Sequence, residues 1–369
     1  MNIILLTIGT LIFISFLYIK RKFSYWKSKG VPYVKPEFPY GNLKGMGTSV
    51  HGSQIMLKLY KKLKGNGPFG GIYFFIQPAI LVTDPELAKS IFVKDFNYFH
   101  DRGVYFNEKD DPLSGHLFSL EGQRWKNVRA KLSPTFTSGK MRMMFNTVLD
   151  VGNEFCKYLL PYAEKSSEIE MKDIAARFTT DVIGSCAFGI ECNSLKNPDN
   201  EFRKMAHKIF DEPTISTMRI FFMSAFRDFS RKLGLKITDP DVSKFFIGVV
   251  KETVDYREKN DVKRNDFMNL LLQIKNFGQI TDDNDETAPS TNLGMLTFNE
   301  LAAQSFVFFI AGFETSSTAM SFCLHELCKN ETVQNKLRTE IMQVLEKHNG
   351  EVTYDAVMEM RYLDNVVNG

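Results

Sequence analysis

The stretch TFNELAAQSFVFFIAGFETSSTAMSFCLHELCK, residues 297–329, decides how this chain folds. It contains no proline and opens with Thr297-Phe-Asn-Glu300, a capping box in which each end residue hydrogen-bonds the backbone of the other. The pattern predicts a helix of about 32 residues, on the order of 48 Å long at ~1.5 Å per residue, enough to cross a whole domain. Residues 301–313 are apolar on almost every side, which is typical of a buried helix.

The middle of this predicted helix is interrupted by Gly312, Glu314 and Thr315. A glycine permits close approach to the backbone, and a threonine hydroxyl can donate to the carbonyl four residues back, here that of Ala311. This combination could form a groove that delivers protons. Spacing alone favours the more ordinary interpretation, a satisfied helix threonine beside a surface glutamate.

Most of the remaining chain has helical periodicity. The segments 71–76 (GIYFFI) and 79–83 (AILVT) flank Gln77-Pro78 and predict a β-hairpin, and Asp84-Pro85 then predicts the start of a helix over 85–94. The fold class is therefore mainly α with a small β-sheet near the N-terminus. We expect further helices over 52–64, 123–131, 139–160, 171–189, 201–210, 240–259, 265–275 and 332–347, and a polar loop over 281–294.

Residues 2–19, NIILLTIGTLIFISFLYI, carry no charge and would span about 27 Å as a helix, which just crosses a bilayer core. Lys20-Arg21-Lys22 follows directly. A cleaved signal peptide is the alternative, but the stretch has no basic region before it and no small-x-small cleavage site. We therefore expect one N-terminal transmembrane helix, with the basic cluster and all later residues in the cytosol.

Composition divides the chain into three parts. We expect an anchor with a basic stop over 1–22, a Pro/Gly-rich hinge over 23–51 and a folded body over 52–369. The three bases of the stop account for the whole net charge of +3, and a neutral body excludes nucleic acid as a partner through bulk electrostatics. The five cysteines include no Cys-x-x-Cys, so we expect reduced, buried thiols and no structural zinc site.

Trp125 and Arg129 lie four residues apart in Trp125-Lys-Asn-Val-Arg129, on one face of a predicted helix. An indole N–H and a guanidinium in this arrangement could hold a carboxylate or a phosphate by charge-assisted hydrogen bonds. An arginine stacked over a surface tryptophan is the more common outcome of such a pair when it stands alone.

Together these motifs resemble the cytochrome P-450 superfamily of haem-thiolate monooxygenases, especially its microsomal, xenobiotic-metabolising insect branch. The resemblance covers essentially the whole chain. It implies the cytochrome P-450 fold, haem (heme, iron protoporphyrin IX) as cofactor, and oxidation of apolar small molecules with dioxygen and NADPH-derived electrons. Its most specific parts are LSPTFTSG at 132–139, AGFET at 311–315 and RYLDNVVN at 361–368.

The resemblance also implies roles for individual residues. Trp125 and Arg129 correspond to the family's contacts to the haem propionates, and Arg102 is a third candidate. Ala311 and Gly312 would line the distal oxygen pocket of the family.

Two further residues, Glu314 and Thr315, would by resemblance relay protons during oxygen activation, with Thr315 also lining the haem pocket. The implied partners are an NADPH-dependent cytochrome reductase, cytochrome b5 as a second candidate electron donor, and an apolar substrate. The implied location is the endoplasmic reticulum membrane, with the body facing the cytosol.

One part of the family pattern is missing. The family continues from Asn-Val-Val-Asn into Glu-x-x-Arg and later into Phe-x-x-Gly-x-Arg-x-Cys-x-Gly, whose cysteine ligates the iron. Here Gly369 takes the place of that Glu, Glu121-Gly-Gln-Arg124 lies in the wrong element, and Cys186 has none of the required neighbours. We therefore expect a C-terminally incomplete fragment without a metal ligand, inactive as given. The alternative is a catalytically dead membrane-anchored protein that binds a partner or an apolar ligand.

Overall fold

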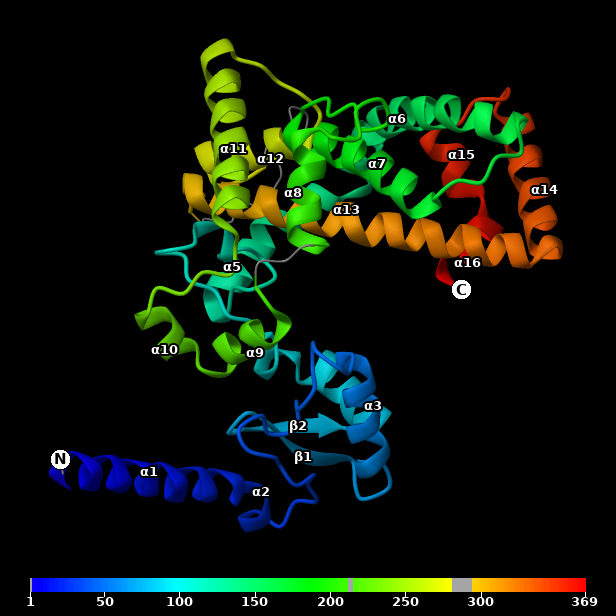
Figure 1. Ribbon diagram of the computed structural model, residues 1–369. Helices are drawn as coiled ribbons and strands as arrows, with labels where there is room; N and C mark the ends of the chain where they lie inside the picture. Colours follow the sequence, from blue (N-terminus) through cyan, green and yellow to red (C-terminus); the bar gives the residue numbers. More distant parts are fainter. Residues whose placement is uncertain (1, 212–214, 281–293) are drawn as a thin grey trace. The chain divides into compact units, whose positions relative to one another are not determined.

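The computed structural model describes residues 2–211, 215–280 and 294–369, and it divides into two compact units. Unit 1 comprises Met1–Asp110 with Ile215–Ile237, and unit 2 comprises Asp111–Thr214 with Thr238–Gly369 (Figure 1). The chain is mainly helical with one small sheet, which confirms the predicted fold class. The loop expected over 281–294 lies outside the described residues, apart from Gly294.

Unit 1 contains the sheet. β1 (Phe69–Phe74) and β2 (Gln77–Val82) pair antiparallel, with Phe69 opposite Val82, so the predicted hairpin is confirmed. Its turn is formed by residues 75–76, whereas Gln77-Pro78, expected between the strands, begins β2. The Asp84 carboxylate accepts the Leu87 N–H at 2.8 Å and caps α4 (Pro85–Lys89), which a π-helical turn, Ser90–Lys94, extends. The other helices of this unit are α1 (Asn2–Phe23), α2 (Tyr25–Ser28), α3 (Gly52–Leu63), α9 (Thr217–Ala225) and α10 (Arg227–Lys232).

The chain that follows α1 packs directly on β1. Trp26 is buried, and its Nε1 donates to the Ile72 carbonyl at 3.0 Å. The Tyr73 hydroxyl donates to the Phe23 carbonyl, also at 3.0 Å. Gly71 leaves room for the indole, because a Cβ there would lie 2.4 Å from the Trp26 Cγ atom. Specific packing therefore joins the end of α1 to the hairpin.

In its described residues unit 2 contains helices and connecting loops but no strand, and α13 crosses it (Figure 1). The helices expected here from periodicity are all present, with ends shifted by a few residues. The shorter helices α15 and α16 do not stand out in the sequence, because six or eight residues give too few turns to establish a period. The helices of unit 2 are α5 (Gly122–Leu132), α6 (Ser138–Glu164), α7 (Met171–Ile183), α8 (Glu201–Phe210), α11 (Pro240–Asn260), α12 (Phe267–Phe277), α13 (Phe298–Lys329), α14 (Glu331–Lys347), α15 (Tyr354–Glu359) and α16 (Arg361–Asn368).

The central helix α13 has the predicted bounds and the predicted cap. The Thr297 side chain accepts the Glu300 N–H at 3.2 Å, and the Glu300 carboxylate accepts the Thr297 N–H at 2.9 Å. Residues 301–306 are all buried, and Phe309 packs its ring 4.8 Å from that of Phe246, centroid to centroid. The core of unit 2 thus forms around the first half of this helix.

The same helix has the composition of a membrane span. Among the residues that the structure describes, Phe298–Lys329 is the one helix long and apolar enough to cross a bilayer. Its first half is buried inside unit 2, which accounts for that composition. The N-terminal anchor stays a prediction: α1 runs from Asn2 to Phe23, and Lys20, Arg21 and Lys22 lie in its last turn.

Candidate functional site

The predicted site begins on an exposed face of α13. Ala311, Thr315 and Ala319 are exposed and four residues apart, so they form one stripe of small side chains in the middle of the helix. The Thr315 hydroxyl donates to the Ala311 carbonyl, the bond that the sequence suggests. Because that carbonyl also closes a helical hydrogen bond, the helix presents a polar point within an otherwise apolar stripe.

Gly312 lies against a different neighbour. A Cβ at this position would lie 2.8 Å from Ile183 Cδ1 and 3.2 Å from Ile183 Cγ1, so the missing side chain makes room for α7. Ile183 and Phe313 are both buried at this helix contact. The close approach that the glycine permits is therefore, in this structure, the approach of a second helix.

Glu314 is held by two partners. Its Oε1 lies 3.0 Å from the Lys172 Nζ atom, at the N-terminal end of α7, and it accepts a hydrogen bond from the Thr318 hydroxyl at 3.3 Å. Thr315, the next residue, instead bonds backward to Ala311. The two residues predicted to handle protons thus make separate contacts, and the structure does not join them in one network.

Trp125 and Arg129 lie on α5, as predicted. Trp125 is buried, whereas Arg129, one turn later, is exposed and has no side-chain hydrogen bond or ion pair with any described residue. The helix is tied to the start of α13 by an ion pair of 3.2 Å between Arg124 and Glu300. A free guanidinium is thus carried one turn from a buried indole on a helix anchored to α13.

Arg102 is an exposed residue of unit 1, while all other predicted site residues belong to unit 2. Within unit 2, Trp125 and Arg129 lie on α5, and Ala311, Gly312, Glu314 and Thr315 lie on α13. The role of Arg102 as a third propionate contact stays a prediction.

Sequence reasoning missed a buried polar contact at the same helix. Gln304 is fully buried, and its Oε1 accepts the Leu117 N–H at 2.9 Å, while its Nε2 has no partner among the described residues. Next to Leu117, burial lowers the pKa of His116 to about 4, so this histidine is neutral at physiological pH. A glutamine within the apolar run 301–313 was the signal available in the sequence.

The cysteines differ from the expectation. Cys186 is buried, but Cys156 and Cys328 are exposed, so the prediction of buried thiols is wrong for these two, which lie on solvent-facing sides of α6 and α13. Burial raises the pKa of Cys186 to about 11 and that of Cys192 to about 12, which keeps both protonated. Within the described ranges, no group of three or more His, Cys, Asp or Glu side chains is placed to hold a metal ion.

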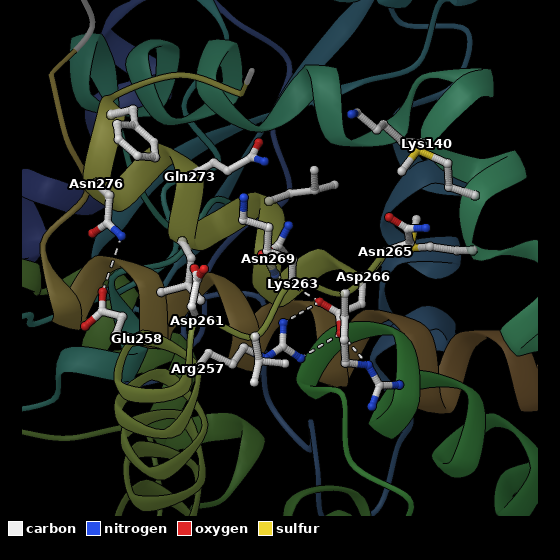
Figure 2. Close-up of a pocket in the computed structure, with 17 residues that line it drawn as sticks. Lys140, Arg257, Glu258, Asp261, Lys263, Asn265, Asp266, Asn269, Gln273 and Asn276 are labelled. Atoms are coloured by element: carbon white, nitrogen blue, oxygen red, sulfur yellow. Dashed lines mark hydrogen bonds and ion pairs between the residues drawn. The ribbon is translucent and has the colours of Figure 1, made fainter. Parts of the chain in front are cut away.

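A large cleft of unit 2, about 1090 Å³, lies elsewhere (Figure 2). Residues of α6, α11, α12 and the segment 261–266 line it, and none of the predicted site residues does. Its strongest contact is the buried ion pair of Arg257 and Asp266, whose two hydrogen bonds measure 2.8 and 2.7 Å. The cleft is therefore a separate feature, and the pair in it is already satisfied.

Comparisons with known proteins indicate the same family over nearly the whole chain. A family model described as Cytochrome P450 matches residues 32–368. The chain is 46% identical over 368 residues to "Cytochrome P450 6A1" of Musca domestica, which covers 100% of this chain and 70% of that protein. It is 49% identical over 349 residues to "Cytochrome P450 6a9" of Drosophila melanogaster, which covers 95% of this chain and 68% of that protein.

Proposed function

The chain belongs to the cytochrome P450 family, whose members are haem monooxygenases, and from that premise we propose that it oxidises apolar small molecules, xenobiotics or endogenous lipophiles. The observation that carries the proposal is the exposed stripe of Ala311, Thr315 and Ala319 in the middle of a helix whose first half is buried in the core of unit 2. Small side chains leave space for a flat cofactor and an apolar substrate, and one hydroxyl supplies polarity there.

The residues present fit haem. Arg129 offers an exposed guanidinium without a described partner, which suits a propionate carboxylate, and Trp125 supplies an indole N–H one turn before it. We propose Arg102 as a further propionate contact. When bound, haem supplies the chemistry that activates dioxygen for insertion into an unreactive substrate bond.

Thr315 is the group that we assign to water and protons. Its hydroxyl donates to the Ala311 carbonyl, so its oxygen lone pairs remain available to accept a hydrogen bond from water. A water held at Thr315 Oγ1 would be oriented on the exposed stripe, where it can pass a proton toward the reacting oxygen. Ala311 borders this position without competing for the water.

Glu314 has a different proposed part. Its carboxylate is bound by Lys172 and Thr318, so it reaches water on the exposed stripe only after it leaves the lysine. We propose that Glu314, once released from Lys172, supplies protons to water at Thr315. Thr315 is then the residue next to the reaction.

We further propose that electrons come from NADPH through a membrane-bound reductase, with cytochrome b5 as a second donor, and that α1 anchors the protein in the endoplasmic reticulum membrane. The apolar length of α1 and the bases of its last turn support the anchor. We also propose that the 369 residues alone form no haem-thiolate centre, because none of the five cysteines stands in the Phe-x-x-Gly-x-Arg-x-Cys-x-Gly pattern that surrounds the family's iron ligand. A red-shifted Soret band under carbon monoxide after haem loading and reduction would contradict this.

The test of the proton assignment is coupling. In the haem-loaded, full-length protein with reductase, Thr315→Ala should raise peroxide released per NADPH consumed by about tenfold or more while haem content stays normal. Ser316→Ala is the matched control, since Ser316 is also exposed but lies off the stripe. Normal coupling in Thr315→Ala, or equal uncoupling in the control, would overturn the assignment.

The test of the propionate assignment is haem retention. Arg129→Ala should lower haem per protein, because it leaves an anion poorly paired, and it should leave coupling per bound haem unchanged. Arg124→Ala on the same helix is the control, because Arg124 is already paired with Glu300. If both variants lose haem equally, the loss reflects helix stability and the assignment fails.

A further inference from the structure

A groove in unit 1 lies where α1 meets the following chain. It has a volume of about 700 Å³ and is lined on one side by α1 and on the other by the segment 33–38. Its walls carry Leu11, Ile12, Ser15, Phe16, Ile19, Lys20, Phe23, Ser24, Lys27, Tyr33, Lys35, Pro36 and Phe38. Side chains of two kinds therefore meet in one groove, large apolar groups and lysines.

The lysines gather at one end of the groove, together with Ile19, Phe23 and Phe38, and no lysine lines the other end. Leu11, Ile12 and Phe16 lie at one end of the α1 wall, and Lys20 lies about 14 Å from Leu11 along the helix axis, at ~1.5 Å per residue. Lys27 and Lys35 add two more ammonium groups from beyond the helix. The groove is thus apolar toward the N-terminal side and basic at the end of α1.

The basic end has no counter-charge of its own. No Asp or Glu lines the groove, and Lys20, Lys27 and Lys35 are exposed without an ion pair to any residue in the described part of the chain. Glu37, which follows this wall, is already bound by Lys44 at 2.6 Å. Three unneutralised ammonium groups at one site favour an anion.

We propose that this groove binds an anionic phospholipid, with an acyl chain against Leu11, Ile12 and Phe16 and the headgroup phosphate among Lys20, Lys27 and Lys35. The order of apolar and basic ends matches the order of chain and headgroup in a bilayer whose core surrounds α1. The exposed Phe38 ring also lines the groove and adds apolar surface for the lipid. This inference rests on the proposed membrane attachment and adds lipid selectivity to it.

The experiment compares vesicles of phosphatidylcholine alone with vesicles of phosphatidylcholine and phosphatidylserine at four to one. Flotation of the full chain with the first kind tests the attachment, and the ratio of the two partition coefficients tests the groove. In Lys20→Gln/Lys27→Gln, we expect that ratio to fall by about tenfold, since each lysine near an anionic surface contributes substantially to binding.

The matched control is Arg21→Gln/Lys22→Gln, which removes two charges from the same turn of α1 at residues that do not line the groove. We expect it to lower the ratio by at least about threefold less than the groove variant does, because it removes a similar diffuse attraction but no contact in the groove. If both double variants lower the ratio equally, the lysines act through diffuse attraction to the surface, and the proposal of a lipid site in the groove is overturned. A wild-type ratio of one would overturn it as well while leaving attachment intact, and flotation with neither vesicle would overturn both proposals.

Discussion

The two halves of α13 have opposite surroundings although both contain bulky apolar side chains. In the first half, residues 301–306, Phe308 and Phe309 are buried by the rest of unit 2. In the second half, Phe313 and Ser317 are buried against α7, while Ala311, Thr315, Ala319 and Phe322 are exposed. One continuous helix is thus a core element at one end and, at the other, a surface able to receive a ligand.

The difference shows that packing gives the two halves different roles. The buried half stabilises the fold, and the exposed half can bind a ligand. Where neighbours surround the helix, each side chain is fixed by several contacts, and change is costly. Where α7 and α8 cover one side of it, the exposed side is available for a cofactor or substrate. We therefore expect substitutions in the two halves to differ sharply in their effect on stability.

The largest effect should come from a matched pair of phenylalanines. Phe309→Ala should lower the free energy of unfolding by about 3–5 kcal/mol, because the ring is fully buried among Phe188, Phe202 and Phe246. Phe322→Ala should change it by less than about 0.5 kcal/mol, because that ring is 67% exposed. Urea denaturation measures both, and similar losses would remove the contrast between the halves.

The second pair lies at the boundary between the halves. Gly312→Leu should cost about 3 kcal/mol, because its side chain would enter the space that Ile183 occupies. Ala311→Leu, one residue earlier but exposed, should cost less than about 0.5 kcal/mol. If denaturation shows that Gly312→Leu is tolerated as well as Ala311→Leu, α7 is not packed closely against this position.

The third prediction concerns pH and the packed first half. The pKa of His116 is lowered to about 4 in the folded protein, so the unfolded chain takes up the proton first as pH falls below about 6.5. The stability that depends on neutral His116 is complete above pH 6.5 and should decline by about 2 kcal/mol between pH 6.5 and 5. His116→Gln should show a shallower decline over this range, and parallel curves for the two proteins would refute the assignment.

The smallest effect is expected for the ion pair on the open half. Lys172→Met should lower the free energy of unfolding by less than about 1 kcal/mol, since the Lys172 side chain is 54% exposed. Lys329→Met, which removes the exposed pair with Glu326 at the end of the same helix, is the control. A loss above about 2 kcal/mol for Lys172→Met alone would show that Glu314 is a structural anchor.

Local signals in the sequence were sufficient for much of the fold. The capping box at Thr297, the proline after Asp84 and the two apolar segments flanking Gln77-Pro78 each describe backbone geometry within a few residues, and the structure confirms the elements that they predict. Trp125 and Arg129 also lie on one helix as expected. The Gln304 contact was missed because its partner, Leu117, is 187 positions away in the chain.

The sequence by itself determined where α13 begins and ends and that Thr315 would bond back to Ala311, because both depend on hydrogen bonds within one helix. Only the tertiary structure decided that Gly312 meets Ile183, that Glu314 pairs with Lys172, and that the stripe containing Thr315 stays open. A helical period specifies which residues share a face. Which face is covered depends on the neighbours that folding brings to it.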